Sequence, residues 1–249
     1  MKVLILAAGV GSRLRPLTDT MPKALVPVCG VPMLQHVILR LKGFGFDDLV
    51  INVHHFANQI IDFLNTNDNF GVKIAISHEE DELLDTGGAI LHAASLLGDN
   101  EPVLVHNVDI LSNCDLRAFV DTHNCSAADA TMLVSNRQSS RYLLFNDQMR
   151  LQGWVNKITN ATKPDKFDYI EGQYVERPYD GIQVFSHSVI ERMMDDGLTG
   201  KFSIIDFYLN RVNNLKIVGQ EMPGLMMLDI GKPETLVVAK EFLYEITNN

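Results

Sequence analysis

The feature that most limits the fold is an unbroken apolar run, VLILAA at residues 3–8, which leads straight into the turn GVG. A strand with one face in water alternates apolar and polar residues, whereas an unbroken run is typical of a strand buried on both faces. Such strands belong to parallel sheets that helices cover on both sides. The run therefore predicts an α/β fold with a buried sheet.

Apolar runs and helical patterns alternate from the N-terminus to about residue 135. Further strands are expected at 48–55, 72–78, 102–110 and 129–136, and helices at 32–45, 57–65, 86–98 and 116–124. This alternation predicts a three-layer αβα architecture around a mostly parallel, Rossmann-like sheet with right-handed connections. Ligands in such sheets bind at the carboxyl ends of the strands, which places residues 8–23, 78–88 and 107–109 along one edge.

The second half of the chain, residues 136–249, is less regular. Its first part predicts a hairpin over 141–158, followed by a long polar loop over 159–176. Strands are then expected at 179–186, 215–221 and 225–231, and helices at 188–197, 202–212 and 233–246. Because no repeat or low-complexity linker divides the sequence, the simplest organisation is a single domain over residues 1–249.

Charge and cysteine content exclude several classes of protein. The formal net charge of -10 leaves no extended basic surface of the kind that general nucleic-acid binding requires. No stretch reaches the roughly 18 apolar residues of a membrane-spanning helix. The three cysteines are scattered and form no CxxC pair, which suits neither a disulfide framework nor a zinc site. We therefore expect a cytoplasmic protein that binds neither nucleic acid nor membrane.

The turn after the first run, GVGSRLRP, gathers positive charge in an otherwise acidic chain. Glycines let backbone N–H groups approach phosphate oxygens, and Arg13 and Lys23 supply cations. The turn is not a Walker loop, because serine rather than lysine follows Gly11. It is not a dinucleotide fingerprint either, because Leu14 stands where the third glycine belongs. A different kind of phosphate loop is indicated.

The segment LAAGVGSRLRPLTDTMPKALVPV at residues 6–28 resembles the signature of the sugar-1-phosphate nucleotidylyltransferases, LAAGxGxRLxPLT followed by PKxLxP. Isoprenoid and molybdenum-cofactor nucleotidyltransferases share the start, but they reach their lysine sooner than the spacing from Arg13 to Lys23. The later stretch LDTGGAI is similar to MurNAc-1-phosphate uridylyltransferases and to mannose- or heptose-1-phosphate guanylyltransferases.

This resemblance implies a GT-A-like fold of the nucleotide-diphospho-sugar transferase type. It also implies an enzyme that transfers a nucleotidyl group from an NTP to a sugar 1-phosphate and releases pyrophosphate. Residues 1–135 would then form the nucleotide-binding half, and residues 136–249 the half that binds the sugar phosphate.

The chemistry of the family gives the loop residues their implied roles. A sugar-phosphate oxygen attacks the α-phosphorus in line, and the protein aligns the two anions. By resemblance, Arg13 clamps the β- and γ-phosphates, and Lys23 stabilises charge on the α-phosphoryl group. The implied nucleotide contacts are Leu6, Ala7, Ala8, Gly9, Gly11 and Ser12. An ordinary glycine turn with solvated cations is the alternative.

Two carboxylates far apart in the sequence are candidates for a Mg²⁺ site. Asp109 ends the apolar run LVHNVD, and Asp229 stands in LDIGKP near the C-terminus. Mg²⁺ prefers hard oxygen ligands and keeps several waters. By resemblance, Asp109 occupies a strand-end GD motif with Val108 in place of the glycine, and Asp229 occupies a WxD[VI]G[TK]P motif. A capping or loop role is the alternative for both.

The loop HEEDELLDTGG is the candidate for reading the base. By resemblance, Glu80 takes an acidic position there, and Thr86, Gly87 and Gly88 form the glycine-led part that follows. A carboxylate accepts hydrogen bonds from guanine N1–H and N2–H or from uracil N3–H, so Glu80 favours GTP or UTP. The alternative is a solvated acidic loop.

The sugar phosphate is expected to bind in the second half. By resemblance, GWVNK aligns with the family segment FxEKP and places Asn156 and Lys157 against the sugar phosphate. YDGIQVF is similar to a family strand whose glycine, here Gly181, lies against the sugar. A plain surface position is the alternative for Lys157.

Two other functions fit parts of the sequence. Val108 and the altered GWVNK segment suit a catalytically weakened homologue that binds nucleotide or NDP-sugar. Aromatic residues that could surround a quaternary ammonium suit transfer to a non-sugar phosphate such as phosphocholine. These residues are Tyr142, Trp154, Tyr169, Tyr174 and Tyr179. The sequence leaves open the sugar, the base and whether the chain forms a homo-oligomer.

Overall fold

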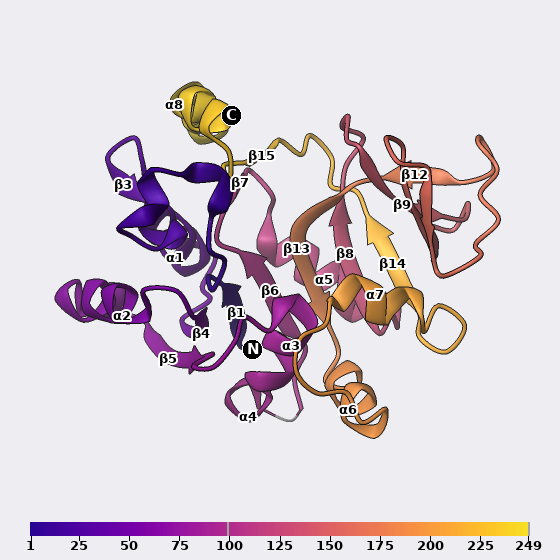
Figure 1. Cartoon of the computed structure of the whole chain (residues 1–249), viewed down its shortest axis with the longest axis horizontal. Helices are drawn as coiled ribbons and strands as arrows, with labels where there is room; N and C mark the ends of the chain where they lie inside the picture. The colour runs from indigo at the N-terminus through magenta and orange to yellow at the C-terminus, as the bar shows by residue number, and fades with distance from the viewer. Residues whose placement is uncertain (99, 249) are drawn as a thin grey trace.

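A seven-stranded sheet forms the centre of the computed structural model, which describes residues 1–98 and 100–248 (Figure 1). Its spatial order is β14-β8-β13-β6-β1-β4-β5. The strands are β1 (Val3–Leu6), β4 (Asp48–Val53), β5 (Lys73–His78), β6 (Val103–Asn107), β8 (Ala130–Val134), β13 (Tyr179–Phe185) and β14 (Ile217–Gln220). β13 runs antiparallel to its neighbours β6 and β8, and the other pairs are parallel. The mostly parallel sheet predicted from the apolar runs is confirmed.

Helices cover both faces of this sheet. Successive residues of a strand point to opposite sides, so the consecutive apolar residues of β1 need a covering layer on each face. Val3 and Ile5 of β1 share a buried cluster with α1 (Met33–Gly43), α2 (Ala57–Thr66) and α5 (Leu116–Ser126). Leu4 lies in a second cluster with α3 (Asp85–His92), α4 (Ala94–Leu97), α6 (Ser188–Asp195) and α7 (Ile204–Leu209). The predicted three-layer αβα architecture is therefore confirmed.

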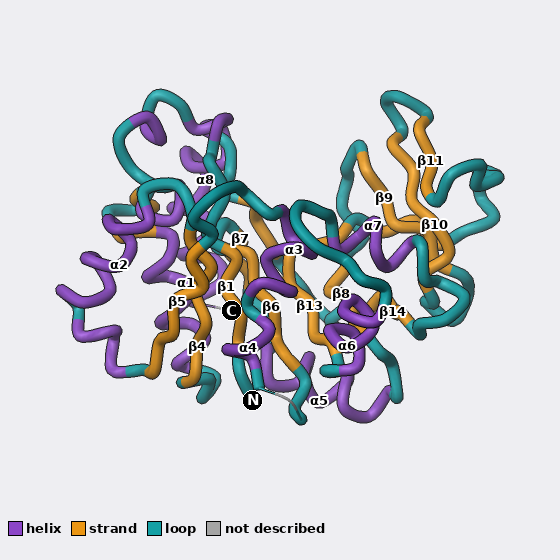
Figure 2. The backbone as a smooth tube through the Cα atoms, turned by 60° about the horizontal axis from the view of Figure 1, so that its bottom comes forward, coloured by secondary structure: helices purple, strands orange, loops and turns teal. Residues whose placement is uncertain are grey.

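A second, four-stranded antiparallel sheet projects from the β8 and β14 end of the central sheet (Figure 2). Its order is β11-β10-β9-β12, formed by β9 (Arg141–Phe145), β10 (Leu151–Asn156), β11 (Ala161–Lys163) and β12 (Val175–Arg177). The predicted hairpin is confirmed as β9 and β10. The loop predicted over 159–176 is wrong in part, because β11 and β12 pair there with the hairpin's outer edges. Such short strands carry no side-chain periodicity and form because open backbone groups need partners.

Two short strands bring the C-terminal segment to the end of β6. β7 (Ile110–Ser112) follows β6 closely, and β15 (Met227–Asp229) pairs with it in antiparallel fashion, with Asp229 opposite Ile110. The N–H of Ile230 donates to the Asp109 carbonyl at 2.9 Å. α8 (Pro233–Asn248) follows β15 (Figure 1). This pairing places Asp229 beside Asp109.

The segment between β1 and α1 contains only short elements. It forms the 3-10 helices Ser12–Leu14, Leu17–Asp19 and Lys23–Leu25, and then a small hairpin of β2 (Pro27–Val28) and β3 (Val31–Pro32). A further 3-10 helix, Asp68–Gly71, precedes β5. The phosphate loop proposed from the sequence is thus a chain of tight turns.

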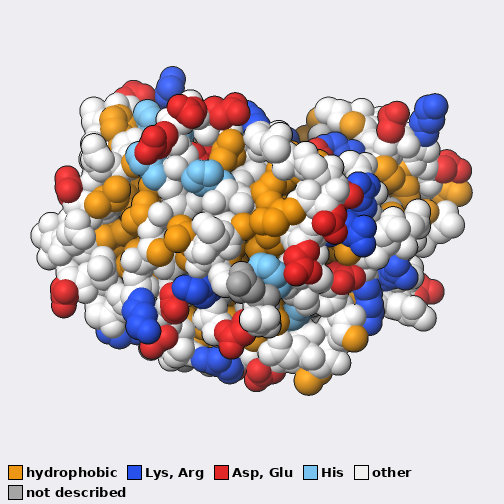
Figure 3. Space-filling view, turned by 90° about the horizontal axis from the view of Figure 1, so that it is seen from below, with side chains coloured by type: hydrophobic (Ala, Val, Ile, Leu, Met, Phe, Trp, Pro, Cys, Tyr) orange, Lys and Arg blue, Asp and Glu red, His pale blue; other side chains and the backbone are white. Residues whose placement is uncertain are grey.

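The surface agrees with the acidic, mixed composition. On the face drawn in Figure 3, acidic and basic side chains both lie mainly toward the edges, and hydrophobic and uncharged side chains fill much of the middle. Over the described part of the chain, no helix combines the length and apolarity needed to cross a membrane. Cys29, Cys114 and Cys125 are free, as their scattered positions suggested.

Candidate active site

The loop after β1 is fixed by its own side chains. Leu14 is buried in the core, and its N–H donates to the Gly11 carbonyl at 2.8 Å. The buried Thr18 hydroxyl donates to the same carbonyl at 2.8 Å. Gly11 has a φ of 68°, and a Cβ there would lie 2.9 Å from side-chain carbons of Lys23 and Thr18. Glycine is therefore needed for the loop to close against the Lys23 stem.

Lys23, Asp109 and Asp229 converge on Gly231. The Lys23 ammonium donates a hydrogen bond to Asp109 Oδ2, and both side chains are largely buried. A Cβ on Gly231 would lie 2.9 Å from Asp109 Oδ2, 2.9 Å from Asp229 Oδ1 and 3.1 Å from Lys23 Nζ. The two carboxylate oxygens are therefore no more than about 5.8 Å apart. The Gly231 N–H also orients Asp229 by donating to Oδ1 at 2.8 Å.

A cavity of about 390 Å³, here called the first cavity, borders this cluster at the carboxyl ends of β1, β4 and β6. Of the predicted residues, it is lined by Leu6, Ala8, Gly9, Lys23, Thr86 and Asp109. Four predicted loop residues do not line it: Ala7 is buried in the core, Gly11 packs within the loop, and Ser12 and Arg13 are exposed. The first cavity thus lies at the carboxyl ends of the strands, where ligands bind in sheets of this kind.

Four further polar residues that line the first cavity were not named as site residues from the sequence, although two of them lie in the ranges 78–88 and 107–109 that were placed at this edge. They are Asn52, Glu79, Asn107 and Lys201. Asn52 and Asn107 lie near the ends of parallel strands, and the rule that singled out Asp109 placed residue 107 at this edge and could also have found Asn52. Lys201 comes from the second half and carried no motif.

The acidic side chain that faces the first cavity is Glu79, whereas the prediction named Glu80. Glu79 is 2% exposed, and its oxygens accept hydrogen bonds from Asn52 Nδ2 at 2.6 Å and from the Leu84 N–H at 2.8 Å. The Glu80 side chain is 80% exposed and lies 4.0 Å from the ring of His78. Because adjacent residues of an extended segment face opposite ways, a shift of one residue exchanges the buried and the exposed carboxylate.

Gly87 and Gly88, predicted to belong to the nucleotide site, pack closely against a distant part of the chain. The N–H groups of both donate to the Phe202 carbonyl, at 2.9 and 3.2 Å. A Cβ on Gly87 would lie 2.3 Å from the Phe202 ring, and one on Gly88 would lie 2.3 Å from the Gly200 carbonyl oxygen. These contacts form a tight joint between α3 and the segment before α7. Thr86 strengthens it by accepting the Ile204 N–H at 3.0 Å.

We expect Gly88→Ala to destabilise the protein by about 1–3 kcal/mol, the usual cost of forcing an atom into a packed contact. The contact is with a backbone oxygen, which cannot turn aside as a side chain can. Urea unfolding measures the change. Gly43→Ala, at the end of α1 with open space around it, is the matched control and should not lose stability. Equal stability of the two variants would contradict the tight joint.

A second cavity of about 430 Å³ borders the same cluster through Asp229. Arg13 lines it from the phosphate loop, and Arg137, Arg141 and Lys163 line it from the region of the antiparallel sheet. Sequence reasoning missed these last three cations, because they lie on short strands or loops without a motif. The second cavity is thus the more basic of the two.

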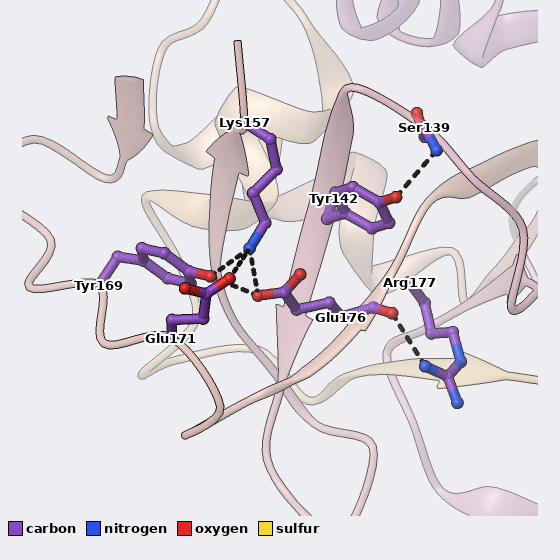
Figure 4. Close-up of polar contacts among 7 residues, drawn as sticks. All are labelled: Ser139, Tyr142, Lys157, Tyr169, Glu171, Glu176 and Arg177. Carbon is purple, nitrogen blue, oxygen red and sulfur yellow. Dashed lines mark hydrogen bonds and ion pairs between the residues drawn. The ribbon is translucent and has the colours of Figure 1, made fainter. Parts of the chain in front are cut away.

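The predicted acceptor residue Lys157 lies outside both cavities and is already paired. Its ammonium donates to Glu176 at 2.8 Å and to the Tyr169 hydroxyl, and Glu171 lies 3.6 Å away (Figure 4). This cluster neutralises the lysine on the antiparallel sheet. The expected contact between Lys157 and a sugar phosphate therefore has no support in its position.

Asn156 and Gly181 also line neither cavity, and both contact nearby residues of the chain. The Asn156 side chain accepts the Ile158 N–H at 3.0 Å and so closes the turn after β10. Gly181 has a φ of 75°, and a Cβ there would lie 2.7 Å from Ile110. Position 181 requires glycine because β13 packs closely against β7 there.

Comparison with known proteins gives consistent relatives. The model of the nucleotidyl transferase family matches residues 2–245. An N-acetylmuramate alpha-1-phosphate uridylyltransferase of Caulobacter vibrioides is 30% identical over 97% of this chain and 96% of that protein. A protein of the same name from Neisseria meningitidis is 46% identical over 49% of this chain and 52% of its own length. A mannose-1-phosphate guanyltransferase of Hypocrea jecorina is 32% identical over 78% of this chain and 51% of that protein. The chain therefore spans about half the length of two of these relatives and nearly all of the third.

Solved structures show the same fold. HddC of Yersinia pseudotuberculosis, complexed with GMP-PN, has a TM-score of 0.76 to this chain at 23% identity. The match covers 97% of this chain and 99% of that one. The match in fold thus extends over nearly the whole chain.

Proposed function

The chain belongs to the nucleotidyl transferase family, and from this premise we propose that it transfers a nucleotidyl group from UTP or GTP to a sugar 1-phosphate and releases pyrophosphate. The observation that carries the proposal is the cluster of Lys23, Asp109 and Asp229 around Gly231, because it joins two cavities. A nucleotide in the first cavity and a sugar phosphate in the second would meet at this cluster.

In the proposed reaction, a phosphate oxygen of the sugar 1-phosphate forms a bond to the α-phosphorus of the NTP. The bond from that phosphorus to the bridging oxygen breaks, and pyrophosphate leaves with the electron pair. Lys23 would hold the α-phosphoryl group and offset its developing charge. Arg13, exposed on the loop, would hold the departing pyrophosphate through its planar fork of donors.

The two aspartates fit Mg²⁺. Their oxygens are hard ligands that lie no more than about 5.8 Å apart, and both would reach one ion once the side chains come within the roughly 4 Å that two Mg–O bonds span. Among the described residues, no group of three or more acidic, histidine or cysteine side chains forms a fuller metal site. Mg²⁺ in such a site keeps waters and takes phosphate oxygens as its other ligands. When bound, it would offset phosphate charge.

The base would lie near Asn52 and Glu79 in the first cavity. Both side chains are buried and bonded to each other, which fixes their orientation toward the cavity. An amide and a carboxylate together can pair with the donors and acceptors on the edge of uracil or guanine. The two relatives named uridylyltransferases support UTP, and the relative named a guanyltransferase supports GTP.

The aromatic residues do not favour transfer to phosphocholine. Trp154 and Tyr179 line the second cavity, whereas Tyr142 and Tyr174 line a different one. The Trp154 ring already has the Lys163 ammonium at 5.4 Å from its centre. A cage for a further cation would have to displace this lysine.

The test is a pyrophosphate-release screen of four NTPs against hexose, heptose and N-acetyl-amino-sugar 1-phosphates. We expect release with UTP or GTP and at least one sugar 1-phosphate, and only when Mg²⁺ is present. Release without Mg²⁺ would contradict the metal site. NTP binding without release from any pair would contradict the proposed transfer and favour a binding homologue.

A further inference from the structure

Asp229 reaches the candidate site through a very short strand pair. β7 and β15 form a two-stranded sheet of their own, with three residue pairs and Asp229 opposite Ile110 (Figure 1). A two-stranded sheet is marginally stable in water. Its inner end is held, because Ile230 is buried and donates its N–H to the Asp109 carbonyl at 2.9 Å. Its outer end, after Ser112 of β7, needs a further contact to hold it.

The position of Asp229 depends strongly on how these two strands are aligned. Residues of a strand follow one another at about 3.4 Å, so a shift of two residues would move the carboxylate by about 6.8 Å. A shift of one residue would turn it to the opposite face. Either shift would take Asp229 out of reach of an ion bound to Asp109, because two Mg–O bonds span roughly 4 Å. The proposed metal site therefore requires one alignment.

Asn113, the residue that follows β7, is bonded to the segment that leads into β15. Its Nδ2 donates to the Gly224 carbonyl at 3.0 Å, and its Oδ1 accepts the Met226 N–H at 2.8 Å. Its backbone N–H also donates to the Met226 carbonyl at 3.1 Å. The side-chain amide has both a donor and an acceptor, as a peptide group has, and it adds two hydrogen bonds to the outer end of the strand pair.

A tight turn fixes the partner of this amide. The Leu225 N–H donates to the Met222 carbonyl at 3.1 Å, and Gly224 has a φ of 65°. Pro223 and Gly224 are the residue types that such a turn favours at its centre. Because the turn sets where the Gly224 carbonyl points, Asn113 makes both of its side-chain bonds when β15 is aligned as observed. Asn113 therefore favours one alignment over the shifted ones.

We propose that Asn113 is a positioning residue, which fixes the alignment of β15 and so places Asp229 beside Asp109 for Mg²⁺. The inference rests on the proposed function and adds to its metal site a residue that is not itself a ligand. Without Asn113, the aligned state is populated for only a fraction of the time, and the apparent affinity for the ion falls by that fraction. A high ion concentration restores the alignment, because the ion favours the state to which it binds. A missing ligand could not be restored in this way.

The test compares Asn113→Ala with the unmodified protein in Mn²⁺ titrations with UTP present, followed by electron paramagnetic resonance. We expect the dissociation constant for Mn²⁺ to rise about tenfold, the factor that corresponds to losing one or two hydrogen bonds. The Mg²⁺ concentration that gives half-maximal pyrophosphate release should rise by the same factor, whereas kcat at saturating Mg²⁺ should stay nearly unchanged. Asn113→Asp keeps the acceptor for the Met226 N–H and should recover part of the affinity.

Asn146→Ala is the matched control. Asn146 Oδ1 accepts the N–H groups of Gln148 and Arg150, at 3.0 and 2.9 Å, in the turn between β9 and β10. This variant also loses two hydrogen bonds to the backbone, but in the antiparallel sheet, so it should lower stability in urea and leave the Mn²⁺ constant unchanged. Hydrogen–deuterium exchange gives a readout without metal. The amides of residues 224–230 should exchange faster in Asn113→Ala and at the normal rate in Asn146→Ala.

Unchanged Mn²⁺ affinity of Asn113→Ala would overturn the inference, and so would unchanged exchange of residues 224–230. A loss of kcat that saturating Mg²⁺ does not reverse would overturn it too, because positioning alone is reversible by the ion. Absence of Mn²⁺ binding in the unmodified protein would overturn the metal site and this inference together.

Pyrophosphate release by the unmodified protein tests the proposed function separately. Release combined with an unchanged Mn²⁺ constant in Asn113→Ala would overturn this inference alone. A tenfold weaker Mn²⁺ constant in a protein that releases no pyrophosphate would support the positioning role and overturn the proposed transfer.

Discussion

Replacing Lys23 with alanine is expected to lower the rate of pyrophosphate release by roughly 100-fold or more, as does the loss of one preorganised charge-stabilising donor in other enzymes. The Lys23 ammonium lies with both candidate metal ligands beside Gly231, where the two cavities meet. Its removal takes positive charge from the place where the α-phosphoryl group would react. The measurement is kcat and kcat/KM with the substrate pair found in the screen.

Two further variants separate chemistry from packing in this experiment. Lys23→Met keeps an aliphatic stem against Gly11 and should lose as much activity as Lys23→Ala. Lys73→Ala removes an exposed lysine of β5 and should leave turnover unchanged. Circular dichroism checks the fold, because either change at Lys23 also removes the hydrogen-bond partner of Asp109. Near-normal turnover of a folded Lys23 variant would contradict the assigned role.

The features that were predicted well from the sequence depend on residues that lie close together along the chain. The unbroken run at Val3–Leu6 indicated a strand buried on both faces, and the helical spacing of α1 follows from its own apolar residues. Because parallel strands end at one edge, Asp109 could be placed there without knowing any contact. The loop from Gly9 to Lys23 was recognisable because residues 6–28 resemble a family signature almost without a break.

The features that the sequence did not predict depend on contacts between distant segments. Glu79 and Glu80 are both acidic, and only the exact end of β5 decides which of them faces the cavity. Gly87 and Gly88 could serve a ligand or a packing contact, and the arrival of Phe202 decides for packing. No local pattern in the sequence records either outcome.

The antiparallel sheet shows the same limit for the acceptor side. Lys157 was expected to meet a phosphate, but folding of residues 159–176 back onto the hairpin surrounds it with Glu171, Glu176 and Tyr169. Besides Arg13, the cations that line the second cavity come from the loop before β9, from the first residue of β9 and from β11. Their shared position exists only once four short strands have paired.

Asp109→Asn is expected to abolish Mg²⁺-dependent turnover while the fold persists. Asparagine has the same size, but it carries no negative charge and is a much weaker ligand for Mg²⁺. Pyrophosphate release should stay at background over a wide range of Mg²⁺ concentration. Mn²⁺ binding in the presence of UTP, followed by electron paramagnetic resonance, gives a readout that does not depend on turnover. Unchanged Mg²⁺ dependence of Asp109→Asn would contradict the metal site.

Asp229→Asn should give the same loss, because the β7–β15 pairing brings this carboxylate to the same point from the other end of the chain. The substituted amide can still accept the Gly231 N–H, so local structure is retained. Asp147→Asn, in the exposed turn between β9 and β10, is the matched control and should remain active. If both aspartates hold one ion, the double variant should be no worse than either single variant, since groups that act as a unit are not additive. Losses that multiply in the double variant would instead mean that each aspartate acts alone, and the shared ion would have to be abandoned.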